Sequence, residues 1–378
     1  MGYKKTSPAC ESGVCRFMYT QLCNLENLLY AHTQAQLDNR YKRKICAFTF
    51  SLEENLFDLR WELDQGLYVP RPYTYFMLHD PKTRSIAAPD FRDRVIQHAL
   101  VNVIQPLFEK QFIYDSYACR TDKGTHLAAK RLKKFLMAAR SFHGKNTSIY
   151  VLQCDIRKFF QSVSWDILLR IMGKTVHCPK TLALIQTIVT SHHHLTAPQR
   201  LVPSQLSLFD SSSDGAKASI SVKHRTGLPI GNLTSQLFAN IYLNELDHFI
   251  KDRLRVRWYG RYMDDFFVLH HDRTYLQQLC ATIDAFLQEK LHLCLHPKKL
   301  TIKNVSTGVP FVGYRTFYDH VLVRGTTLRR IERNYRSKEK QVKNGRITSK
   351  KLAETKASII GHFKHANSHG LTKHLLRP

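Results

Sequence analysis

The sequence is poor in acidic residues and contains no long apolar run. Its 378 residues include 30 Asp and Glu against 57 Lys and Arg, which gives a formal net charge of +27. An excess of this size favours a polyanionic partner, with nucleic acid as the leading class, although a generally basic and soluble surface is the alternative. No apolar stretch has the length of a signal peptide or of a membrane span, so we expect a cytoplasmic protein without a membrane partner.

Cysteine pairs with metal-ligand spacing are also missing. The nine cysteines are odd in number and include no Cys-x-x-Cys pair. This argues against a disulfide framework and against a zinc finger, and it favours reduced thiols. Hydrophobic residues make up 43% of the chain and charged residues 23%, as in globular proteins. At this length we expect two or three domains with a full core.

Two adjacent carboxylates interrupt an aromatic-rich segment. Residues 256–262 and 266–269 are predicted to be strands, which would place Asp264 and Asp265 at the tip of a hairpin. Two like charges this close repel each other, and a bound cation would relieve the repulsion. The alternative is an ordinary polar turn, because Asp is a common turn residue.

A third carboxylate follows a predicted buried strand. Residues 149–154 have the apolar pattern of such a strand, and Asp155 stands at its end with Ile156 beside it. Asp155, Asp264 and Asp265 together offer oxygen ligands for two Mg²⁺ ions, with Mn²⁺ as a substitute. We count Ile156 with them among the metal-contacting residues.

The other segments are expected to form helices, strands and loops around these carboxylates. Ser51 and Glu54 form a predicted capping box that opens a helix ending near Gly66, and residues 91–112 form a strongly amphipathic helix. Further expectations are a basic helix to about Arg140, a polar loop over 196–226, a helix over 275–290, a strand over 291–295, and a tail from Arg324 with 15 Lys and Arg against three acids.

Several short motifs follow one another in a fixed order along the chain. They are a basic hairpin with Lys82 and Arg84, a turn with Arg120 and Lys123, the strand ending at Asp155 with Phe160 five residues on, the Gly231 turn and helix, Tyr262-Met263-Asp264-Asp265, Lys298-Lys299, and Phe311-Val312-Gly313-Tyr314. This order resembles the ordered sequence blocks of reverse transcriptases. The similarity covers roughly residues 70–320.

The resemblance implies an α+β fold shaped as a right hand, with fingers, a palm of antiparallel sheet and helices, and a helical thumb. It implies an N-terminal extension at 1–66, fingers at 67–148, a palm at 149–308 that includes the inserted loop, and a palm–thumb transition with a basic thumb at 309–378. It also implies RNA-directed DNA polymerase activity by two-metal nucleotidyl transfer. The substrates would be template RNA, an RNA–DNA duplex and deoxynucleoside triphosphates.

The same resemblance implies roles for individual residues. Asp155, Asp264 and Asp265 would be catalytic, and Phe160 would lie against the sugar and exclude a 2′-hydroxyl. The expected nucleotide-binding residues are Lys82, Arg84, Arg120, Phe160, Ile230, Gly231 and Gln236. The expected nucleic-acid-binding residues are Lys123, Lys130, Lys133, Lys134, Arg261, Tyr262, Lys298, Lys299, Gly313, Arg329 and Arg330.

The fourth block departs from the usual pattern of the family. Where relatives have Gln-Gly-x-x-x-Ser-Pro, this chain has Ile230-Gly231-Asn232-Leu233-Thr234-Ser235-Gln236. The departure resembles the diversity-generating retroelement branch, whose enzymes make errors at template adenines and imply a small basic oligomeric accessory protein as partner. A retron or group II intron-type enzyme is the alternative within the family. An inactive RNA-binding scaffold is the alternative outside it, which the complete set of three carboxylates disfavours.

Overall fold

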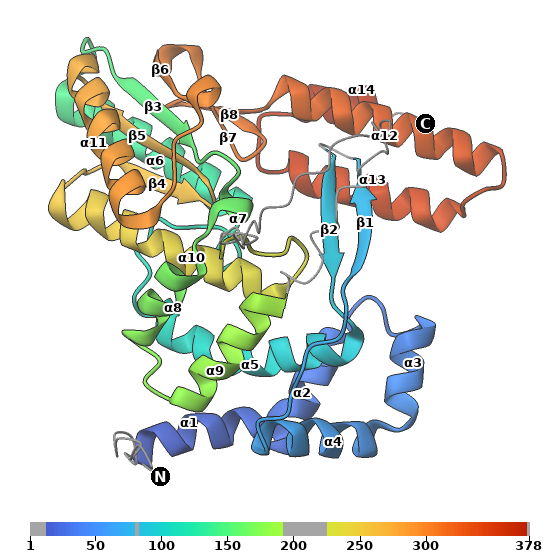
Figure 1. Cartoon of the computed structure of the whole chain (residues 1–378). Coiled ribbons are helices and arrows are strands. Elements are labelled where there is room, and N and C mark those ends of the chain that lie inside the picture. Colours follow the sequence, from blue (N-terminus) through green and yellow to red (C-terminus); the bar gives the residue numbers. More distant parts are fainter. Residues whose placement is uncertain (1–12, 80–82, 192–224, 376–378) are drawn as a thin grey trace, which may run out of the picture. The chain divides into compact units, whose positions relative to one another are not determined.

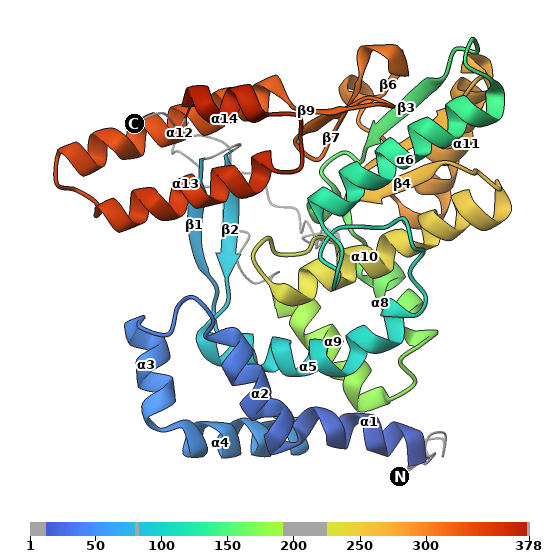
Figure 2. The same ribbon diagram turned by 180° about the vertical axis from the view of Figure 1, so that it is seen from behind.

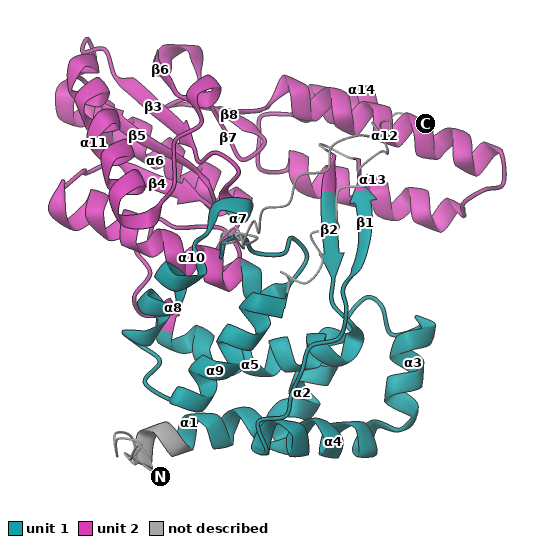
Figure 3. Ribbon diagram, in the orientation of Figure 1, with its two compact units in different colours: residues 1–77, 85–107, 160–235 teal, residues 78–84, 108–159, 236–378 magenta. Residues whose placement is uncertain are grey.

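The computed structural model describes residues 13–79, 83–191 and 225–375 (Figure 1). Helices and antiparallel sheets follow one another along the chain, so the predicted α+β class is confirmed. The chain divides into two compact units (Figure 3), one of residues 1–77, 85–107 and 160–235 and the other of residues 78–84, 108–159 and 236–378. Among the described residues, no helix combines the length and the apolar character that crossing a membrane requires.

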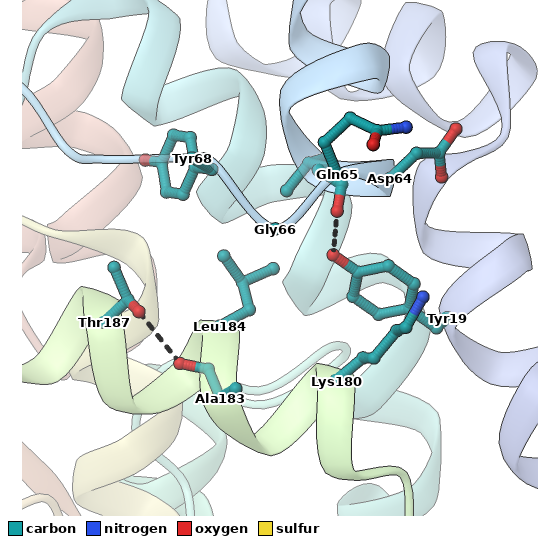
Figure 4. A pocket seen from close by; sticks show the side chains of 10 residues that line it. Tyr19, Asp64, Gln65, Gly66, Tyr68, Lys180, Ala183, Leu184 and Thr187 are labelled. Carbon is teal, nitrogen blue, oxygen red and sulfur yellow. Dashed lines mark hydrogen bonds between the residues drawn. The ribbon is translucent and has the colours of Figure 1, made fainter.

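The first unit is mostly helical. All or most of each of the following elements belongs to it: α1 (Gly13–Cys23), α2 (Leu25–Ala35), α3 (Arg43–Phe50), α4 (Leu52–Asp64), β1 (Thr74–Leu78), β2 (Arg84–Ala88), α5 (Phe91–Glu109), α7 (Phe159–Ser162), α8 (Trp165–Gly173) and α9 (Pro179–Thr190). A small pocket lies where α1, α4 and α9 meet (Figure 4), and there the Tyr19 hydroxyl donates to the Leu63 carbonyl at 2.6 Å. This hydrogen bond joins α1 to α4, and residues of α9, far away in sequence, line the same pocket.

The start of α4 differs from the prediction. Ser51 precedes the helix as expected, but its side chain makes no capping hydrogen bond. The reason is that α3 ends at Phe50, so Ser51 is the only residue between two helices, with φ −108° and ψ 50°. The predicted capping box therefore does not form, although the predicted helix does, with Leu56, Leu59 and Leu63 buried at helical spacing.

The second unit contains the sheet that carries the three carboxylates. Its strands run in the order β4-β5-β3-β6, and every neighbouring pair is antiparallel. The elements up to this sheet's last strand are α6 (Thr125–His143), β3 (Tyr150–Asp155), α10 (Leu233–His248), η2 (Phe249–Arg253), β4 (Tyr259–Tyr262), β5 (Asp265–His270), α11 (Arg273–Leu291), η3 (Pro297–Lys299) and β6 (Thr301–Asn304).

Helices α6 and α11 cover opposite faces of this sheet, as Figures 1 and 2 show from opposite sides. Phe267 of β5 and Val151 of β3 pack with apolar residues of α6. Cys154 of β3 lies instead beside Cys280 of α11. Because successive strand residues point to opposite faces, odd-numbered residues of β3 and β5 share the α6 side.

The last part of the chain adds a small sheet and three helices. The elements are η4 (Val305–Thr307), β7 (Val309–Phe311), β8 (Tyr314–Thr316), β9 (Val321–Val323), α12 (Gly325–Lys343), α13 (Ser349–Phe363) and α14 (His369–Leu375). Tyr335, Ile359 and Phe363 form a core of their own with Val323. The predicted basic helical tail is therefore a packed helical element that keeps its cations on the outside.

Two predicted strands need correction. The strand expected from residue 256 begins only at Tyr259, because Arg255 has φ +51° and Val256 N–H closes the η2 turn on the Ile250 carbonyl. The strand expected over 291–295 is absent from the described residues there: α11 runs to Leu291, and His292 at φ +50° ends it. Leu295 keeps a single β-bridge, to Ile156. The loop predicted at 196–226 lies outside the described residues except for its last two.

Candidate active site

The sheet brings two of the three carboxylates face to face. In the antiparallel pairing of β3 with β5, Asp155 is the register partner of Asp265. Directly opposed residues have their Cβ atoms about 5 Å apart and on one face. Asp155 and Asp265 are the last and first residues of their strands, so both carboxylates stand at the edge where the apolar core ends.

Asp264 reaches the same edge through a tight turn. Tyr262 pairs with Asp265, which leaves Met263 and Asp264 as the two turn residues. Met263 has φ +55°, a conformation that few residues with a side chain adopt. The Asp264 carbonyl accepts a hydrogen bond from Ile156 N–H at 3.2 Å, which ties the turn to the end of β3. The predicted hairpin with both carboxylates at its tip is present.

The three carboxylates repel one another. Burial and the charge of Asp155 raise the pKa of Asp264, and Lys299 and Arg84 offset this only in part. Burial of its carboxyl, a hydrogen bond with Asp155 and the charges of Asp264 and Asp155 raise the pKa of Asp265 to about 7. Asp265 as a whole residue is exposed to solvent, so we attribute the raised pKa of its carboxyl chiefly to the nearby carboxylates Asp155 and Asp264. The edge is thus an anionic site suited to cations.

Lys299 lies at this site. It is the last residue of η3, and its ammonium forms an ion pair with Asp155. The sequence predicted a nucleic-acid contact for Lys299, whereas the structure gives its ammonium a carboxylate partner. The Lys299 ammonium therefore contacts a carboxylate oxygen that could otherwise bind a metal ion.

We expect Lys299→Gln to increase the thermal stabilisation that added Mg²⁺ gives, because the substitution removes the cation that competes for Asp155. The melting temperature would be measured with and without Mg²⁺. Lys298→Gln is the control, since Lys298 is exposed on the same short helix and its ammonium forms no ion pair with a described carboxylate. Equal stabilisation of wild type and Lys299→Gln would contradict the competition.

The donor set fits divalent cations of the Mg²⁺ type. Such cations take oxygen ligands and often bind through one or two protein carboxylates completed by substrate phosphates. Asp155, Asp264 and Asp265 offer carboxylate oxygens, and Ile156 offers its main-chain carbonyl. Within the described ranges, no three His, Cys, Asp or Glu side chains already surround a common point.

Phe160 and the start of the fourth block, at Ile230, both belong to the first unit. Leu228 N–H donates to the Phe160 carbonyl at 2.6 Å, and Gly227 N–H donates to Val163 at 2.9 Å. Phe160 and Ile230 are both half-buried. Gln236, near the start of α10, is exposed. The predicted nucleotide-binding residues Phe160 and Ile230 therefore lie on two segments that main-chain hydrogen bonds join to each other.

The main chain at Gly231 packs closely against another part of the protein. Its φ is +127°, and a Cβ built there would lie 2.7 Å from the Ala87 carbonyl and 3.0 Å from Ile86 of β2. The sequence predicted that a glycine here lets the backbone come close to a ligand. In the structure the close approach is to the β1–β2 hairpin, and Ala87 N–H also donates to the Ile230 carbonyl at 2.9 Å.

The predicted triphosphate contacts differ in how available they are. Lys82 lies outside the described residues, and Arg84 is exposed at the start of β2. Arg120 has only 6% of its side chain exposed and pairs with Glu109 at 2.6 Å. Its guanidinium also donates to two main-chain carbonyls. Arg120 therefore has a structural role here, and of the two predicted arginines that the structure describes, Arg84 is the accessible one.

The predicted nucleic-acid contacts fall into two groups. Most are at least partly accessible: Lys123, Lys130, Lys133, Lys134, Tyr262, Lys298, Gly313, Arg329 and Arg330. Arg261 is the correction, because it has no exposed surface and pairs with Asp247, itself fully buried. A guanidinium without exposed surface has no access to nucleic acid. The sequence analysis missed Asp247, although a carboxylate amid the apolar residues of α10 was the available signal.

Known proteins share this chain's sequence pattern. The family profile described as reverse transcriptase (RNA-dependent DNA polymerase) matches residues 79–316. Protein YkfC of Escherichia coli (strain K12) is 24% identical over 291 residues, which are 68% of this chain and 70% of YkfC. Group II intron-encoded protein LtrA of Lactococcus lactis subsp. cremoris is 25% identical over 201 residues, 52% of this chain and 28% of LtrA.

Solved structures of telomerase are similar at lower identity. Apo telomerase from Candida tropicalis, truncated from its C-terminal domain, has 13% identity and a TM-score of 0.47, with 72% of this chain and 60% of that chain covered. This chain thus spans less than two thirds of that telomerase and of LtrA. The profile match covers well over half of the chain and includes all three carboxylates. The chain belongs to the reverse transcriptase family, the RNA-directed DNA polymerases.

Proposed function

We propose that this reverse transcriptase copies a template RNA into adenine-mutagenised cDNA as part of a diversity-generating retroelement. The observation that carries the proposal is Ile230, which stands where the family usually has glutamine. An isoleucine side chain can pack against a nucleotide but cannot donate or accept a hydrogen bond. Losing a polar contact that orients the nucleotide weakens discrimination between correct and incorrect pairs.

The chemistry would take place at the edge of the palm sheet. Mg²⁺ held by Asp155, Ile156, Asp264 and Asp265 would favour ionisation of a primer 3′-hydroxyl and offset charge on the departing pyrophosphate. The three carboxylates would supply the negative charge that attracts the cations, and Lys299 forms an ion pair with Asp155 at the same edge. Phe160 would lie against the sugar and exclude a 2′-hydroxyl, and Arg84 would contact the triphosphate.

We expect Ile230→Gln to reduce errors opposite template adenine roughly 10-fold, which is the size of effect that one hydrogen bond gives. The amide restores a polar group that can orient the nucleotide. The error rate would be measured by sequencing cDNA made on a template with adenines at known positions.

Ile230→Val is the matched control, because it keeps an apolar branched side chain at the same position. Errors opposite adenine should stay at the wild-type level in Ile230→Val. If Ile230→Gln also keeps the wild-type error rate while both variants extend primers, the role given to Ile230 is wrong.

The proposal includes partners beyond the nucleotides. The accessible cations Lys130, Lys134, Lys298 and Arg329 would contact phosphates of the template RNA and the RNA–DNA duplex, which gives binding that weakens with salt. A small basic oligomeric accessory protein would assist synthesis. Adding that protein to the primer-extension assay would test whether it assists synthesis.

A group II intron-type activity is the second candidate. It is favoured by the 25% identity with LtrA, a group II intron-encoded protein. Accurate cDNA synthesis would support this candidate over the retroelement, because the two differ in the errors expected opposite template adenine.

A further inference from the structure

A fully buried ion pair lies directly behind the carboxylate turn. Arg261 of β4 and Asp247 of α10 both have side chains with 0% exposure. The Arg261 Nε donates to Asp247 Oδ1 at 2.7 Å, and Nη2 donates to Oδ2 at 2.6 Å. Burying two charges is costly unless their remaining hydrogen-bonding groups are also satisfied.

All five N–H groups of this guanidinium have acceptors. Besides the two bonds to Asp247, Nη2 donates to Ser116 Oγ at 3.0 Å and Nη1 donates to Asn240 Oδ1 at 3.2 Å. The fifth bond runs from Nη1 to the main-chain carbonyl of Met263 at 3.1 Å. The Tyr259 hydroxyl completes the set by donating to Asp247 at 2.6 Å. A lysine could not make these contacts at once, because it is a point donor.

The contact with Met263 joins the ion pair to the candidate active site. Met263 is the turn residue with φ +55°, and it directly precedes Asp264. A conformation of this kind persists only where the surroundings hold it. The main chain of Arg261 is itself fixed, since its N–H donates to the Asp115 carbonyl at 2.9 Å and its carbonyl accepts from Tyr117 N–H at 3.0 Å.

We propose that Asp247 and Arg261 are positioning residues for the catalytic turn. Asp247 orients the guanidinium, the guanidinium holds the Met263 carbonyl, and the held turn presents Asp264 and Asp265 together to a divalent cation. The inference rests on the proposed polymerase function and adds to it. A role in fold stability alone would need the Asp247 contact but not the contact with Met263.

The test compares Arg261→Lys with wild type. Binding of Mn²⁺ alone, followed by electron paramagnetic resonance, should weaken about 10- to 100-fold, the usual effect of losing a group that orients metal ligands. The half-saturating Mg²⁺ concentration in primer extension should rise in parallel. Arg92→Lys is the matched control, because Arg92 pairs with Glu62 in the other unit and its side chain is 11% exposed. That control should bind Mn²⁺ as wild type does.

Two further variants keep the test decisive if Arg261→Lys does not fold. Ser116→Ala removes one acceptor of the guanidinium and should weaken Mn²⁺ binding about fivefold. Adding Met263→Asn to either variant should recover part of the affinity, because Asn adopts positive φ more readily than Met.

The possible results separate this inference from the proposed function. Mn²⁺ affinity within twofold of wild type in the network variants, or no recovery with Met263→Asn, would overturn the positioning role. Normal Mn²⁺ binding by wild type without any DNA synthesis on RNA would instead overturn the proposed function. The Mn²⁺ titration then still decides the role of Asp247 and Arg261.

Discussion

Asp264→Asn is expected to abolish primer extension, with the rate falling at least about 1,000-fold. The amide keeps the size of the side chain but removes the charge that holds a divalent cation. The same substitution should raise the melting temperature of the metal-free protein. The pKa of Asp264 is raised by burial and by Asp155, so its ionised form is unfavourable in the folded state at neutral pH.

Loss of primer extension together with a higher melting temperature distinguishes a carboxylate that serves function from one that stabilises the fold. Asp319→Asn serves as the control, since Asp319 is exposed and pairs only with the neighbouring His320 among the described side chains. It should change the polymerisation rate by less than about twofold. Synthesis by Asp264→Asn at a rate near that of wild type would contradict the assignment of the carboxylate cluster.

Gly231→Ala is expected to lower the free energy of unfolding by about 2–4 kcal/mol. The new Cβ would meet the Ala87 carbonyl at 2.7 Å, and alanine does not readily adopt φ +127°. The carbonyl cannot move easily, because the neighbouring Ala87 N–H is bonded to Ile230. Urea unfolding followed by circular dichroism would give the change in free energy.

Gly345→Ala separates the two causes. Gly345 also has positive φ, +67°, but a Cβ there meets nothing within 4 Å. Its substitution should therefore cost only about 1 kcal/mol, from backbone conformation alone. If Gly231→Ala is no more destabilising than Gly345→Ala, the close approach to the hairpin does not matter for stability.

The sequence predicted the carboxylate edge because its signals are local. An apolar run that ends in Asp155 and two apolar strands around Asp264 are patterns within a few residues, and the structure contains both. The α+β class followed from the family resemblance. Helices with regular apolar spacing were also predictable, as the buried leucines of α4 show.

The sequence did not reveal which polar groups would find partners inside the protein. The sequence predicts Arg261 as a contact for nucleic acid and Arg120 as a contact for the nucleotide, but Asp247 and Glu109 bind them in the folded chain. Asp247 is 14 residues before Arg261, on a different element. Ion pairs of this kind depend on tertiary packing, which residue spacing does not encode. The same holds for Gly231, whose close neighbour Ala87 is far away in sequence.

Primer extension on an RNA template, followed by sequencing of the products, tests the central claim most directly. The assay would contain Mg²⁺ and the four deoxynucleoside triphosphates, with the accessory protein added in a parallel reaction. We predict cDNA from wild type and not from Asp264→Asn, with substitutions concentrated opposite template adenines. Accurate cDNA would contradict the retroelement assignment, and no cDNA in either reaction would contradict polymerase activity itself.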